Sequence, residues 1–175
     1  MKDEMRLKKD IPVLMMQSLL VEIKNLSKII PKFKEISEKR RLNEGFIGVL
    51  GKKDGVRLVL FTFTDNELMV HFLSSKGILH RIVKFVYENN LGRLYDYGLY
   101  NCIYLDKFEP ERREKLIEKK KQHDPQYILN PYKLIESFTS YRRINIIFEL
   151  NLLWRKMAVK LGMDKIISIY NDKTI

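Results

Sequence analysis

The side chains best suited to chemistry in this sequence are three histidines, His71, His80 and His123, and a single cysteine, Cys102. Imidazole and thiolate groups bind transition metals or act as bases and nucleophiles. Such sites need several groups close together, and these four residues are scattered along the chain. We expect His71 in the apolar core, His80 on the outer face of a helix and Cys102 as a structural cysteine, and we predict no metal site.

Signatures of nucleotide and metalloprotease chemistry are missing from the sequence. It contains no G-x-x-x-x-G-K-[ST], no G-x-G-x-x-G and no H-E-x-x-H. Each of these motifs aims backbone N–H groups at a phosphate, or paired histidines at a metal. Any chemistry therefore depends on which polar side chains the fold brings together.

The composition is that of a folded, basic protein. Of the 175 residues, 45% are hydrophobic and 31% are charged, and 33 Lys and Arg against 22 Asp and Glu give a formal net charge of +11. A single cysteine excludes an intrachain disulfide and favours a cytoplasmic location. The sequence has no uncharged apolar run of eighteen residues and no signal-peptide core, so we expect no transmembrane segment. Association with a membrane through a partner stays open.

Hydrophobic periodicity predicts a sequence of alternating strands and helices. Segments 19–23, 46–50 and 56–64 are expected as strands, 26–41 and 78–86 as amphipathic helices, 93–97 as a short extended piece, 110–122 as a charged helix and 144–170 as a helical tail. Strand 56–64 is apolar on both faces, so we expect it to be central in its sheet. Segment 68–73 fits either a strand or the start of a helix.

Turn and cap residues mark where these elements begin and end. Asp54-Gly55 predicts a hairpin, Pro31 predicts the first turn of its helix, and Ser74 or Ser75 is a candidate N-cap for the next helix. Asn89-Asn90, followed by Gly92, should stop that helix. Gly162 is expected to break the tail, and one apolar face of the tail is expected to contain Ile147, Leu150, Leu153 or Trp154, Met157 and Leu161.

This order of elements predicts an α+β fold, with a ferredoxin-like antiparallel sheet, helices on one face and a C-terminal helical tail. The expected organisation is an N-terminal segment over 1–18, an α+β domain over 19–135 and the helical tail over 136–175.

A resemblance to a known family rests on the second half of the predicted domain. Lysines 119–121 precede Asp124-Pro125, and Ile-Leu-Asn-Pro-Tyr-Lys follows at 128–133. This resembles the closing signature of the FAD-linked oxidases, a helix followed by Asp-Pro and Leu-Asn-Pro-Gly-Lys, with Tyr132 where glycine is usual. Segments 20–27, 45–55 and 92–101 resemble a strand and helix start, a glycine-rich turn and a second active-site loop, in the same order. The similarity spans roughly residues 19–135 and covers the C-terminal (cap) domain of 2-hydroxyacid dehydrogenases.

The resemblance implies a substrate-side domain of an FAD-dependent dehydrogenase or oxidase that acts on a 2-hydroxyacid such as lactate or glycolate. It implies catalytic roles for Tyr97 and Asn101, cofactor contacts for Gly98, Tyr100, Asn130 and Lys133, and contact of Arg93 with the small anionic substrate. The family's flavin-binding domain does not occur in this chain. The resemblance therefore implies that FAD comes from a missing or separate domain or subunit.

The chain departs from the family's pattern at the catalytic histidines. Segment 48–55 lacks the histidine that many relatives carry in the first loop, and Asp96-Tyr97-Gly98 stands where they have Glu-His-Gly. A histidine there would act as base on the substrate hydroxyl. Tyrosine, with an unperturbed pKa of about 10, is a poor base at neutral pH, so Tyr97 is expected to hydrogen-bond a substrate oxygen.

Two other functions stay open at this stage. A basic nucleic-acid-binding module is less favoured, because the cations are spread along the chain; its stacking residues would be Phe61, Phe63, Tyr95 and Tyr97. A catalytically silent subunit would dock a partner through Leu150, Leu153, Trp154 and Met157. The substrate, the electron acceptor and the oligomeric state are not determined by the sequence.

Overall fold

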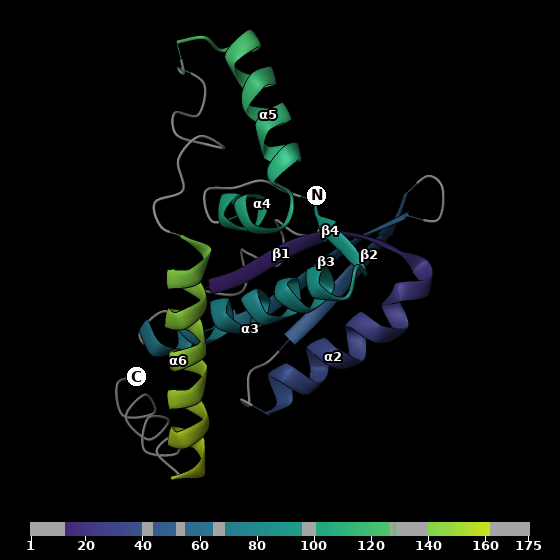
Figure 1. Ribbon diagram of the computed structural model, residues 1–175. Helices are drawn as coiled ribbons and strands as arrows, with labels where there is room; N and C mark the ends of the chain where they lie inside the picture. The colour runs from purple at the N-terminus through teal and green to yellow at the C-terminus, as the bar shows by residue number, and fades with distance from the viewer. Residues whose placement is uncertain are drawn as a thin grey trace.

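The structure, a computed structural model, describes residues 13–39, 44–51, 55–64, 69–95, 101–126, 128 and 140–161 (Figure 1). Its strands are β1 (Val13–Glu22), β2 (Glu44–Leu50), β3 (Gly55–Thr64) and β4 (Gly92–Leu94). Its helices are the 3-10 turn η1 (Ile23–Asn25), α2 (Leu26–Glu38), α3 (Met69–Glu88), α4 (Cys102–Phe108), α5 (Pro110–His123) and α6 (Tyr141–Lys160).

The four strands form one antiparallel sheet in the order β2-β3-β1-β4. Along the chain the elements of the sheet and its helices run β1-α2-β2-β3-α3-β4, which makes two interlocked β–α–β units. The α+β class is therefore confirmed, and β3 lies inside the sheet as its two apolar faces predict. Ambiguous segment 68–73 is helical from Met69 onward.

The hydrophobic core lies between one face of the sheet and helices α2 and α3. Alternate residues of β1 and β3 point into it because successive side chains of a strand face opposite ways. Its fully buried side chains include Leu19, Leu58 and Leu60 from the sheet, Ile29 and Phe33 from α2, and Ile78 and Ile82 from α3. Each such burial stabilises the fold by about 1.5–3 kcal/mol before chain entropy is subtracted.

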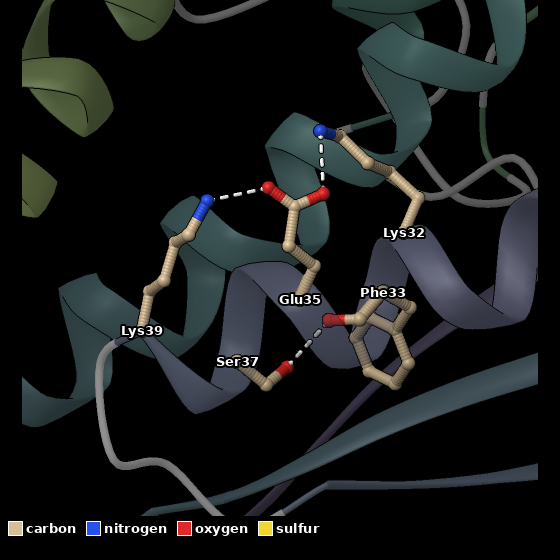
Figure 2. Close-up of polar contacts among 5 residues, drawn as sticks. All are labelled: Lys32, Phe33, Glu35, Ser37 and Lys39. Atoms are coloured by element: carbon tan, nitrogen blue, oxygen red, sulfur yellow. Dashed lines mark hydrogen bonds and ion pairs between the residues drawn. The ribbon is translucent and has the colours of Figure 1, made fainter.

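Helix α2 begins at Leu26, where the predicted segment 26–41 begins, but Pro31 is not in its first turn as predicted. Pro31 lies in its second turn, because the 3-10 turn η1 already starts the helical path at Ile23. The buried Ser37 hydroxyl donates to the Phe33 carbonyl oxygen at 3.0 Å (Figure 2). This bond satisfies a polar group on the core side of the helix.

The outer side of α2 carries a small charge network. Hydrogen bonds from Lys32, at 2.8 Å, and from Lys39, at 2.5 Å, lower the pKa of Glu35 to about 2 (Figure 2). Both lysines lie within one turn of the carboxylate, at the spacings that bring side chains together on a helix. The network is exposed to solvent and contributes little to stability.

Two of the predicted chain reversals are confirmed. The Gly51 N–H donates to the Gly55 carbonyl oxygen at 2.7 Å where β2 turns into β3. Asn90 follows the end of α3 in the left-handed region, with φ 51°, which asparagine tolerates better than most residues. The predicted caps Ser74 and Ser75 are wrong, because both are buried inside α3.

Helix α6 lies across the N-terminal half of α3 (Figure 1). Its buried apolar residues are Ile144, Phe148 and Leu152, whereas Leu150 and Leu153 of the predicted face are 60% and 54% exposed. The predicted tail face is therefore the outer one. The described helix ends at Lys160, just before the predicted break at Gly162; Gly162 and the rest of the predicted tail lie outside the described residues. Among the described residues, no helix is both long and apolar enough to cross a bilayer.

Candidate functional site

The strand register places two arginines on the sheet face opposite the core. Leu20 of β1 pairs with Arg57 of β3 on one side and with Arg93 of β4 on the other. Directly paired residues of antiparallel strands point to the same face, and their neighbours Leu19, Leu58 and Leu94 face the core. Arg57 and Arg93 therefore share the second face, roughly 10 Å apart at the backbone, since one strand separates them.

Tyr95 follows β4 directly and lies on the same sheet face as Arg57 and Arg93. Its backbone N–H donates to the Ser18 carbonyl oxygen at 3.0 Å, which extends the β4–β1 pairing by one residue. The Arg57 guanidinium lies over the Tyr95 ring, 4.6 Å from its centroid, and its Nη2 donates to the Ser18 hydroxyl at 3.4 Å. A cation over a ring face is worth about 0.5–1 kcal/mol at exposed sites. Tyr95 and Arg57 thus hold each other in place at the start of the predicted active-site loop.

A hollow of about 450 Å³ opens beside Arg93, where β1 ends and β4 begins. Gly55, where the first predicted loop ends, and Gly92-Arg93, where the second begins, both line it. A Cβ added at Gly92 would lie 2.6 Å from the Leu20 carbonyl oxygen, so the close strand pairing here requires glycine. The structure therefore places the end of the first predicted loop and the start of the second at one hollow.

The chemistry of this β4-edge site (Arg57, Arg93, Tyr95 and the hollow) is anion recognition. Arg93 is exposed at the hollow and offers a planar fork that can donate two N–H groups to one carboxylate. The volume suits a small acid. Among the residues that line the hollow, Arg93 is the one cation and Glu22 is the one carboxylate, which is paired with Lys24. This lining does not provide the phosphate-binding groups that FAD requires, so the described residues do not fit FAD itself.

The predicted site residues fall in three groups. Arg93 lies in the β4-edge site. Asn101 precedes α4, where its backbone oxygen accepts from the Tyr104 N–H at 3.1 Å, and it lines a different cavity. Tyr97, Gly98, Tyr100, Asn130 and Lys133 lie outside the described residues. Arg57 was missed, although a charged residue inside an apolar central strand is a signal that could have revealed it.

A second polar cluster surrounds His80, which is 1% exposed. Its Nε2 lies 3.0 Å from the Asn145 side-chain oxygen and its Nδ1 lies 2.7 Å from the Tyr104 hydroxyl. An amide oxygen only accepts, so Nε2 carries the proton, and Nδ1 accepts from the Tyr104 O–H. Burial lowers the pKa of His80 and raises that of Tyr104, which keeps both groups neutral.

The His80 cluster is structural and not a binding site. Its cavity has a volume of about 20 Å³, room for one water molecule at most. The predicted exposure of His80 is wrong because α6 covers that side of α3, and nothing near His80 in the sequence indicates which helix does so. Cys102 is buried beside this cluster, as expected of a structural cysteine.

Helix α5 ends at the Asp-Pro pair, and polar contacts of the aspartate stabilise that end. Asp124 is buried, and its carboxylate accepts from the Ile128 backbone N–H at 2.9 Å and from the Lys120 ammonium at 3.1 Å. The carboxylate thereby ties the last turn of α5 to the chain that follows it. Asp124 and Lys120 of α5 thus stabilise the end of the helix together.

Three further observations limit the functions that the site can have. No group of three or more His, Cys, Asp or Glu that could hold a metal ion occurs among the described residues. Of the candidate stacking residues, Phe61 is buried against Gly45, whereas Tyr95 is 46% exposed. No known protein family, curated protein or solved structure matches this chain.

Proposed function

We propose that this chain is the substrate-side domain of an FAD-linked oxidoreductase that oxidises a small 2-hydroxyacid such as lactate or glycolate. The observation that carries the proposal is the placement of Arg93, beside Arg57 and Tyr95, at the hollow where the two loops of the family resemblance meet. FAD would be held by another domain or subunit and would accept the hydride. The role of this chain is to bind and orient the acid.

Arg93 anchors the substrate carboxylate in this proposal, and Arg57 supplies a second positive charge on the same face. A charge-assisted arginine–carboxylate pair is roughly twice as strong as a neutral hydrogen bond. Tyr97, from segment 92–101, would hydrogen-bond the hydroxyl oxygen. Asn101 lines a separate cavity beside His80, so it takes no part in this proposal. Gly98, Tyr100, Asn130 and Lys133 would face the flavin and close the site.

The proposal is tested by titrating the isotope-labelled chain with glycolate and lactate and following backbone NMR shifts. Saturable shifts are expected around Arg93, Arg57 and Gly92, whereas glycolamide, which lacks the carboxylate, should cause none. Arg93→Gln should weaken binding at least about tenfold, as for a lost charged hydrogen bond. Lys107→Gln, on exposed α4 surface, is the matched control. Equal weakening by both variants would contradict the assignment.

The cofactor part of the proposal has its own test. The purified chain should be colourless, because the described residues do not fit FAD. Flavin absorbance in stoichiometric amounts would contradict the assignment of FAD binding to another domain or subunit. A reading frame next to this one that encodes a flavin-binding domain, and whose product copurifies with the chain, would support it.

A second candidate is nucleic-acid binding, which the exposed Tyr95 between two arginines favours. Base–aromatic stacking and phosphate contacts would then act together on the sheet face. Binding of single-stranded RNA that weakens steeply with salt, and that Tyr95→Ala reduces, would select this function over the first.

A further inference from the structure

Helix α6 turns an uninterrupted apolar surface toward solvent. The outer stripe, as we call it, consists of Ile146, Ile147, Leu150, Leu153, Trp154, Met157 and Leu161, each of which is at least 46% exposed. These positions recur every three or four residues and therefore lie on one side of the helix. Together they expose on the order of 600 Å² of apolar surface, at the upper end of the largest patch found on a typical monomer.

The outward orientation of this stripe is set by polar contacts on the opposite side of α6. Glu149 accepts from Arg81 Nε of α3 at 3.0 Å, Asn151 accepts from the Ser74 hydroxyl at 2.9 Å, and Asn145 accepts from His80. The helix thus places these polar groups, together with Ile144, Phe148 and Leu152, against the protein and leaves the outer stripe in solvent. A rotation that buried the outer stripe would break all three contacts.

The charged residues that flank the outer stripe are basic. Arg142 and Arg143 lie at the first turn of α6, and Lys156 and Lys160 lie at its last turns, all of them exposed. The one acidic residue of α6, Glu149, is engaged by Arg81. The surface therefore offers apolar contact and positive charge.

We propose that the outer stripe docks this protein on an anionic lipid surface, with α6 lying in the plane of the headgroups. Helices with this combination of aromatic and aliphatic stripe and flanking cations bind at the headgroup–acyl boundary. Each flanking Lys or Arg gains from the negative surface potential of anionic lipids. A second copy of the chain fits less well, because an antiparallel pair of α6 helices would bring Arg142 of one copy near Lys160 of the other.

Trp154, the one tryptophan of the chain, lies within the outer stripe and reports directly on this docking. The full chain is mixed with vesicles of phosphatidylcholine alone or of phosphatidylcholine with phosphatidylserine, and sedimentation measures the bound fraction. We expect binding to the anionic vesicles, a blue shift of the Trp154 emission, and quenching of that emission by lipids with brominated acyl chains.

Two variants separate the apolar and electrostatic contributions. Leu150→Asn with Leu153→Asn, both at exposed positions, should leave the fold intact and weaken vesicle binding at least about tenfold. Arg143→Gln, Lys156→Gln and Lys160→Gln together should weaken it on the order of 100-fold. The matched control removes three exposed charges from α5, through Lys115→Gln, Lys119→Gln and Lys121→Gln, and should weaken binding much less.

Three outcomes would overturn the proposal. The first is vesicle binding without any change in Trp154 emission, which would mean that general charge and not the outer stripe makes the contact. The second is a blue shift that depends on protein concentration without lipid, which would assign the stripe to a second copy. The third is absence of binding to anionic vesicles. None of these outcomes bears on the carboxylate titration at Arg93, so the two proposals fail separately.

Discussion

The orientation of α6 makes a sharp prediction about two adjacent leucines. Leu152 is fully buried and Leu153 is 54% exposed. Replacing leucine by alanine removes three carbons, and at about 0.8 kcal/mol for each buried carbon the transfer cost at Leu152 is about 2.4 kcal/mol. A cavity term adds to this, so Leu152→Ala should cost about 3–4 kcal/mol. Leu153→Ala should change stability by less than about 0.5 kcal/mol.

Urea and thermal unfolding measure both variants. For a chain of this size, Leu152→Ala should lower Tm by roughly 6–16 °C, whereas Leu153→Ala should leave it nearly unchanged. Equal losses at the two positions, or a larger loss at Leu153, would refute the orientation of α6 and with it the outer stripe.

A double-mutant cycle tests the same contact from the other side. A Cβ added at Gly77 of α3 would lie 2.9 Å from Leu152 Cγ. Gly77→Ala alone therefore overpacks the helix interface, which offsets its gain in helix propensity of up to about 1 kcal/mol. With Leu152→Ala present the clash disappears, and Gly77→Ala should become at least about 1 kcal/mol more favourable. A coupling energy near zero would show that the two residues are not in contact.

Further predictions concern the pH dependence of stability, two glycines of β2 and the end of α5. Burial lowers the pKa of His80 below its ordinary value of 6.5, so the unfolded chain binds a proton that the folded chain does not. Stability should be full above pH 6.5 and fall as pH drops below it, and His80→Gln should flatten this slope in urea titrations. Gly45→Ala should destabilise the protein, because its Cβ would lie 2.2 Å from the Phe61 ring, whereas Gly48→Ala, with its nearest contact at 3.5 Å, should be tolerated in thermal unfolding. Asp124→Ala removes the acceptor of the Ile128 N–H and should speed amide exchange and proteolysis after α5, while Glu118→Ala on the exposed side of α5 should not.

The sequence alone predicted those features of the structure that depend on residues close together in the chain. Gly51 and Gly55 flank the turn that closes the β2–β3 hairpin, Pro110 begins α5, and Asn90 takes the positive φ that ends α3. Each of these features depends on a few consecutive residues and on their backbone preferences. The apolar residues on both faces of β3 likewise predicted an inner strand without any knowledge of its neighbours.

The candidate site was predictable in part. Arg93 and the two glycine-bearing segments came from the resemblance, but their meeting at one hollow depends on the pairing of β1 with both β3 and β4. Arg57 lies 36 residues before Arg93 in the sequence, and only the register of three strands places both on one face.

What the sequence by itself determined is most of the strands and helices, the turns between them and the α+β class, because short-range spacing encodes those features. Helix α4 and the first part of β1, residues 13–18, were not predicted. The tertiary structure alone decided which face of α6 is buried, why His80 is enclosed and which arginines act together. Both faces of α6 are apolar, so periodicity cannot distinguish them. The choice depends on Ser74, His80 and Arg81, which lie more than sixty residues earlier in the chain and turn the polar side of α6 inward.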